Sequence, residues 1–158
     1  KFNSALRNFV LVLFSTLLIS ACSTAKKAKV DTVDDVYTGT DTVEYLAKGV
    51  PDRVFFATNK SKLTTRSRDT LRKQATWLRK NKDVTVTIEG HADERGTREY
   101  NLALGERRAN AAKDYLMTYG VSGKRMSVIS YGKEKPVNPA STPLAWSQNR
   151  RSVTVKAN

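Results

Sequence analysis

The feature that most constrains this chain is a strictly alternating segment at residues 84–89. Its sequence is Val84-Thr85-Val86-Thr87-Ile88-Glu89. Because successive side chains of a β-strand point to opposite faces, the aliphatic residues fall on one side and the polar residues on the other. The segment is therefore predicted to be a strand with one buried face, in a sheet that another layer must cover.

Two helices are predicted, one on each side of this strand in the sequence. Residues 65–80 are good helix formers and carry an apolar stripe at Leu71, Ala75 and Leu78. Residues 101–119 form the second predicted helix. At about 100° per residue, one narrow arc of that helix holds small and apolar residues, namely Leu102, Gly105, Ala109, Ala112 and Leu116. Small residues on this arc would let the helix approach a sheet closely.

Three further runs of strand-forming residues complete the pattern, at residues 53–56, 126–131 and 152–155. The order is strand, helix, strand, helix, strand, strand, which gives a parallel crossover first and a mixed sheet overall. We therefore predict an α+β fold, a βαβαββ sandwich in which a mixed four-stranded sheet has its helices packed on one face. This domain is expected to occupy residues 51–158.

The first 22 residues have the features of an export signal. Lys1 and Arg7 supply positive charge, and the apolar run after them is too short for a comfortable transmembrane helix. Residues 18–22, Leu-Ile-Ser-Ala-Cys, resemble a bacterial lipobox and end at Cys22, the single cysteine of the chain. The resemblance implies that residues 1–21 are a lipoprotein signal peptide and that Cys22 carries the lipid. The alternative is a short membrane anchor with an incidental buried cysteine.

Residues 22–50 are predicted to be the lipidated cysteine and a flexible periplasmic tether, because they lack a sustained apolar period. Ser23 stands where the lipobox resemblance would place an inner-membrane-retaining aspartate, which implies the outer membrane. The net charge of +13 favours an anionic partner without choosing among nucleic acid, a membrane surface and an acidic polymer. The same charge also fits a solvated basic surface that has no partner.

A charged loop lies between the alternating strand and the second helix. Its sequence is Gly90-His91-Ala92-Asp93-Glu94-Arg95-Gly96-Thr97-Arg98-Glu99-Tyr100. Loops at strand ends concentrate binding groups, and the free N–H groups of a helix start favour an anion. On the helical wheel Arg107 points into solvent, whereas Arg108 and Asn101 share the shoulder over which the loop folds.

Spacing alone leaves two interpretations of Asp93 and Arg108 open. In the first, the two residues form an ordinary salt bridge that pins the loop. In the second, they bind a ligand that carries both an ammonium and a carboxylate group. Asp93 would then meet the ammonium, while Arg108 and the free N–H groups would meet the carboxylate.

The segment from Gly90 to Ala109 is similar to the signature of the OmpA-like peptidoglycan-binding domain, and the likeness extends over residues 53–155. The subtype resembles the peptidoglycan-associated lipoproteins of the Tol–Pal system. In that family the matching aspartate and arginine hold the side-chain end of meso-diaminopimelate in the stem peptide. The resemblance therefore implies that Asp93 and Arg108 bind peptidoglycan.

The same resemblance implies supporting residues. Asn101 and the backbone of Arg95 would assist, and Phe56 and Ala57 match the wall of the site. Ala57 and Asn59 stand in a loop where the family often has acidic residues.

The resemblance implies a non-catalytic lipoprotein that anchors the outer membrane to peptidoglycan, with TolB among its partners and a role in envelope integrity and cell division. No cofactor or metal is expected, because one cysteine and one histidine cannot form a zinc cluster. Two other classes remain as alternatives. His91 beside the acidic loop would suit a cell-wall hydrolase accessory, and Arg150-Arg151 would suit a nucleic-acid-binding module. Nucleic acid is not expected as a partner, because the basic residues are spread out and no stacking motif accompanies them.

Overall fold

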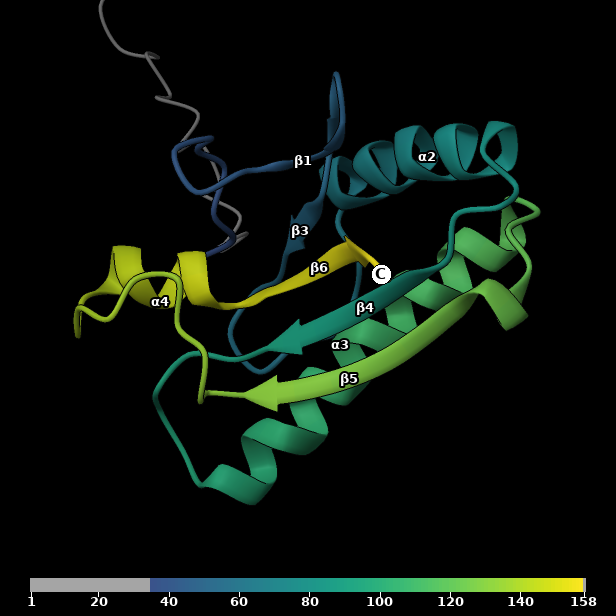
Figure 1. The fold of residues 1–158 in the computed structure, drawn as a ribbon. Helices are drawn as coiled ribbons and strands as arrows, with labels where there is room; N and C mark the ends of the chain where they lie inside the picture. Colours follow the sequence, from purple (N-terminus) through teal and green to yellow (C-terminus); the bar gives the residue numbers. More distant parts are fainter. Residues whose placement is uncertain (1–34, 158) are drawn as a thin grey trace, which may run out of the picture. The chain divides into compact units, whose positions relative to one another are not determined.

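The sheet of this protein has four strands in the order β3-β6-β4-β5 (Figure 1). The computed structural model describes residues 35–157. The strands are β3 (Arg53–Phe55), β4 (Val86–His91), β5 (Met126–Gly132) and β6 (Arg151–Lys156). Strands β4 and β5 pair in parallel, whereas β6 runs antiparallel to both of its neighbours. The predicted mixed four-stranded sheet is confirmed.

Helices α2 (Thr65–Lys80) and α3 (Arg98–Thr118) form the two crossovers and lie on the same face of the sheet (Figure 1). Each helix begins after a threonine N-cap. Thr64 Oγ1 accepts a hydrogen bond from the Ser67 amide at 3.1 Å, and Thr97 Oγ1 accepts one from the Tyr100 amide at 3.2 Å. Helix α2 has the predicted bounds, whereas α3 begins at Arg98 rather than at residue 101 because Thr97 caps it.

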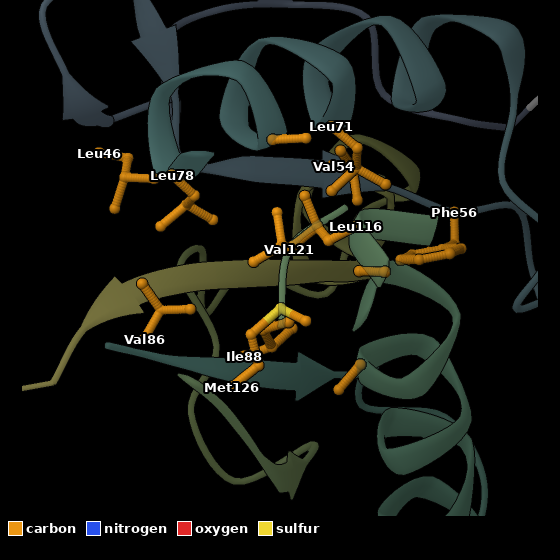
Figure 2. Close-up of a cluster of buried hydrophobic side chains, with 13 residues drawn as sticks. Leu46, Val54, Phe56, Leu71, Leu78, Val86, Ile88, Leu116, Val121 and Met126 are labelled. Carbon is orange, nitrogen blue, oxygen red and sulfur yellow. The ribbon is translucent and has the colours of Figure 1, made fainter. Parts of the chain in front are cut away.

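The apolar face of β4 packs against both helices, as its alternation predicts. Val86 and Ile88 are buried with Leu71 and Leu78 of α2 and with Leu116 of α3 (Figure 2). The buried arc of α3 is, however, turned from the helical-wheel prediction. Leu104 and Arg108 are buried inside the molecule, whereas Leu102 is half-buried.

Helix α3 approaches the sheet most closely at Gly105. A Cβ atom at this position would collide with Ser130 Oγ and lie 2.9 Å from the Gly90 carbonyl oxygen. A larger residue would push the helix away from the sheet. The expected close approach is confirmed, and it fixes the spacing between β4 and α3, which hold the two ends of the charged loop.

Three pieces of secondary structure were not predicted. Helix α4 (Pro143–Asn149) lies between β5 and β6, and β1 (Tyr45–Ala47) pairs with β2 (Val50–Pro51) in a small hairpin. The short length of α4 hides its apolar period, although Thr142 followed by Pro143 is a typical helix start. A short 3₁₀ turn, η1 (Gly123–Arg125), precedes β5.

The packed part of the chain begins before residue 51, the predicted start of the domain. Leu46 of β1 is 5% exposed and belongs to the main core, and Tyr37 packs edge-on against Phe55 at 4.8 Å between ring centroids. This packing could not be predicted from the sequence, because two isolated apolar residues do not form an apolar periodicity. The described residues do not include the proposed signal peptide, Cys22 or residues 23–34 of the proposed tether. Within residues 35–157, no helix is long and apolar enough to cross a membrane.

Candidate functional site

The centre of the candidate site is the carboxylate of Asp93, in the loop between β4 and α3. Asp93 is 7% exposed. It accepts hydrogen bonds from the backbone amide, Nε and Nη2 of Arg95 at 3.1, 3.0 and 2.7 Å, and from Arg150 Nη1 at 3.2 Å. Burial raises the pKa of this carboxyl, but the hydrogen bonds from Arg95 and Arg150 outweigh burial and lower the pKa below its usual value. Asp93 is therefore an anion held in a sheltered position.

Arg108 is fully buried beneath the loop, on α3. Its Nε donates to the Lys60 carbonyl at 2.9 Å, Nη1 to that of His91 at 2.8 Å and Nη2 to that of Ala57 at 3.0 Å. Burial and the nearby charge of Arg150 lower the pKa of Arg108 to about 10, so the group is still a cation at neutral pH. Arg108 thus ties the loop after β3 to the end of β4.

The salt bridge that the sequence left open between Asp93 and Arg108 is not present among the described residues. The ion-pair partners of Asp93 are Arg95 and Arg150, whereas the three side-chain hydrogen bonds of Arg108 go to backbone carbonyls. The helical wheel placed Arg108 on the shoulder of α3 because it took Leu102 as a core residue. With Leu104 in the core instead, Arg108 turns inward.

Asn101 and Arg95 shape the loop around Asp93. Asn101 is 2% exposed, and its side-chain Nδ2 donates a hydrogen bond to the Arg95 carbonyl at 2.8 Å. The guanidinium of Arg95 lies 4.3 Å from the ring centroid of Trp146, on α4. The backbone of Arg95 is thus held in place, as expected for a supporting residue, while its side chain covers Asp93.

The loop after β3 contributes main-chain groups. Phe56 is fully buried beneath Arg108, with 5.3 Å between its ring centroid and the guanidinium carbon. The Phe56 carbonyl accepts Arg150 Nε at 3.0 Å, and the Ala57 carbonyl accepts Arg108. The neighbouring Thr58 presents its backbone N–H and its hydroxyl to the site.

Sequence reasoning missed Arg150 as a site residue. Its side chain is 3% exposed and bridges two carboxylates, those of Asp93 and Asp35, at 3.2 and 3.1 Å. The sequence showed Arg150 only as part of a basic motif. Its place next to Asp93 depends on β6 inserting between β3 and β4, which no local pattern reveals.

Helix α4 fixes the outer side of the Asp93 loop. Trp146 Nε1 donates to Glu94 Oε1 at 2.8 Å, and the Ser141 hydroxyl donates to Glu94 Oε2 at 3.0 Å. These hydrogen bonds lower the pKa of Glu94. The Asp93 loop is therefore held by Arg108 of α3 and by hydrogen bonds from Trp146 of α4 and from Ser141 just before α4, so the fold sets the position of Asp93.

A sequence model of the OmpA family matches residues 55–150. The chain belongs to the OmpA family. Its relatives include the peptidoglycan-associated lipoprotein of Brucella melitensis, 44% identical over 150 residues that cover 92% of this chain and 89% of the relative. The peptidoglycan-associated lipoprotein of Rhizobium meliloti is 58% identical over 106 residues, which make up 67% of this chain and 60% of that relative's length.

Solved structures show the same OmpA family fold. The peptidoglycan-associated lipoprotein from Burkholderia pseudomallei superposes with a TM-score of 0.66 at 37% identity, covering 67% of this chain and 90% of the other. The C-terminal domain of Helicobacter pylori MotB has a TM-score of 0.63 at 21% identity, covering 68% and 84%. The predicted α+β architecture is thereby confirmed.

The imidazole of His91, the candidate base that the sequence offered, is buried in this OmpA family domain. It is 1% exposed, and burial together with the charges of Arg151, Arg53 and Lys135 lowers its pKa to about 3. It faces the opposite side of the sheet from α3, where it lines a basin of about 640 Å³ that Asp93 and Arg108 do not line. Over residues 35–157 no cluster of histidine, cysteine or acidic residues could hold a metal ion.

Proposed function

We propose that this chain is a non-catalytic lipoprotein that binds peptidoglycan and attaches the outer membrane to it as part of the Tol–Pal system. Relatives named peptidoglycan-associated lipoprotein match up to 94% of the chain, and the family match covers residues 55–150, which include Asp93, Arg108 and Arg150. In this role the Tol proteins, TolB among them, are its partners in envelope integrity and cell division.

The observation that carries the proposal is the pairing of opposite charges in one sheltered place. The Asp93 anion lies 3.2 Å from the Arg150 cation, and the backbone N–H of Thr58, which donates to a carboxylate here, lies in the same site. The side chain of meso-diaminopimelate ends in an ammonium and a carboxylate on one carbon. Its ammonium would pair with Asp93, and its carboxylate would take the Thr58 N–H and Arg150.

Arg108 has a supporting role in this proposal. Three of its five N–H groups are already engaged with carbonyls, so in this proposal it contributes positive charge behind the ligand carboxylate and holds the three carbonyls that shape the floor. Asn101 keeps the Arg95 loop in place, and Phe56 and Ala57 supply the packed wall.

Sedimentation of the full chain with purified sacculi tests the function directly. We expect the protein to pellet with sacculi, to be released by excess diaminopimelate-containing stem peptide, and to liberate no soluble fragments. Release of fragments would indicate a hydrolase. If excess stem peptide did not reverse the pelleting but moderate salt abolished it, the protein would be binding by general charge, as a polyanion binder does.

Membrane attachment is proposed to depend on Cys22. Acyl chains on this residue would supply the free energy of anchoring, because each buried methylene contributes about 0.8 kcal/mol. Cys22→Ser is therefore expected to release the folded protein into the periplasm once peptidoglycan is digested. If the Cys22→Ser protein still fractionated with the outer membrane after digestion, the lipoprotein assignment would be wrong.

A further inference from the structure

The candidate site is occupied by an acidic residue of the same chain, Asp35. The backbone N–H of Thr58 donates to both carboxylate oxygens of Asp35, at 3.1 and 3.0 Å, and the Thr58 hydroxyl also bonds to this carboxylate. Arg150 Nη2 pairs with Asp35 Oδ2 at 3.1 Å. Asp35 therefore takes the same two donors that the proposed function gives to a ligand carboxylate.

The neighbouring cation position is occupied too. The Arg95 guanidinium lies on Asp93, with Nη2 at 2.7 Å from Oδ2, and also reaches the Thr58 hydroxyl at 3.3 Å. One internal anion and one internal cation thus lie side by side in the site. Together they match the two charges of a zwitterionic ligand.

Asp35 is held in place by the segment that follows it. Tyr37 is 7% exposed and packs against Phe55, and Gln148 Nε2 donates to Asp41 Oδ2 at 3.0 Å. Leu46 secures the end of this segment in the core. Such anchoring keeps Asp35 at a high effective concentration near Thr58 and Arg150.

We propose that Asp35 is an internal substitute for the ligand carboxylate, so that a stem peptide must displace Asp35 from Thr58 and Arg150 in order to bind. The inference rests on the proposed function, because it takes the same site as the peptide site. The half-exposed side chain of Asp35, 46% accessible, makes this displacement feasible without unfolding the domain. The observed affinity of the free protein is then lowered by the fraction of molecules in which Asp35 is bound.

Titration of a diaminopimelate-containing stem peptide into the full chain in detergent tests the proposal. Asp35→Ala is expected to bind the peptide about three- to tenfold more tightly than the unchanged protein, the range expected for losing an internal ion pair of this kind. Asp114→Ala is the matched control, since it removes an exposed carboxylate from α3 and should leave the affinity unchanged. Equal affinities of Asp35→Ala and the unchanged protein would overturn the proposal.

A readout without peptide separates this inference from the proposed function. Amide hydrogen exchange at Thr58 is expected to be slow in the unchanged protein and at least about tenfold faster in Asp35→Ala, because Asp35 is the acceptor for this N–H. If no variant bound the peptide but Thr58 were protected by Asp35, the peptide function would fail while the internal contact stood. If the unchanged protein bound the peptide but Thr58 exchanged equally fast in both proteins, the inference would fail while the function stood.

Discussion

Arg108→Ala is expected to lower the free energy of unfolding by about 3–5 kcal/mol. The change removes a fully buried guanidinium and leaves the carbonyls of Lys60, His91 and Ala57 without their donor. Each buried acceptor left unpaired costs about 1–3 kcal/mol unless water enters. Urea unfolding followed by tryptophan fluorescence measures this loss. The apparent peptide affinity should fall by at least the amount that the decrease in the folded fraction explains.

Arg107→Ala provides the matched control, because Arg107 is the exposed neighbour of Arg108 on the same helix. It should change stability by no more than about 0.5 kcal/mol, as is usual for surface sites. Arg108→Lys keeps a positive charge but cannot serve three carbonyls in three directions, so it should recover only a part of the loss. Equal stabilities of Arg107→Ala and Arg108→Ala would contradict the tying role of Arg108.

Asp93→Ala is expected to weaken stem-peptide binding by about 2–5 kcal/mol, since it leaves the ligand ammonium unpaired in a sheltered site. The same change frees Arg95 and removes one of the two carboxylates on Arg150, so some loss of stability accompanies it. Calorimetric titration alongside urea unfolding distinguishes the two effects. The binding loss should exceed what the unfolded fraction explains.

Asp83→Ala removes an exposed carboxylate in the turn between α2 and β4, and it should leave the affinity unchanged. Full binding by Asp93→Ala would exclude the proposed role of this carboxylate, whatever the result for Arg108.

The fold was predictable because its main elements carry strong periods. Strand β4 alternates from Val86 to Glu89 and α2 carries a clear apolar stripe, so both patterns identify the element and its buried face. The register of α3 was less certain, because its small and polar residues give several arcs of similar character. The error placed Arg108 on a shoulder, whereas the real core arc includes Leu104 and buries Arg108.

The candidate site was predictable only in part, for a topological reason. The Asp93 loop could be located because it joins a strand to a helix in the sequence. Arg150 and Asp35 reach Asp93 and Thr58 from distant parts of the chain, separated from their partners by 57 and 23 residues. Such contacts follow from the insertion of β6 between β3 and β4 and from the packing of Tyr37, and neither leaves a local pattern.

The most direct test of the central claim is a comparison of two stem peptides on the unchanged protein, one with diaminopimelate and one with lysine in its place. Lysine retains the ammonium for Asp93 but lacks the carboxylate for Thr58 and Arg150. Isothermal titration should therefore show the diaminopimelate peptide binding more tightly by at least about tenfold, or 1.4 kcal/mol. A lysine peptide need not displace Asp35 from Arg150, whereas a diaminopimelate peptide must. This displacement limits the expected difference in affinity between the two peptides. Equal binding of the two peptides would contradict the claim that this site recognises the carboxylate and ammonium of diaminopimelate together.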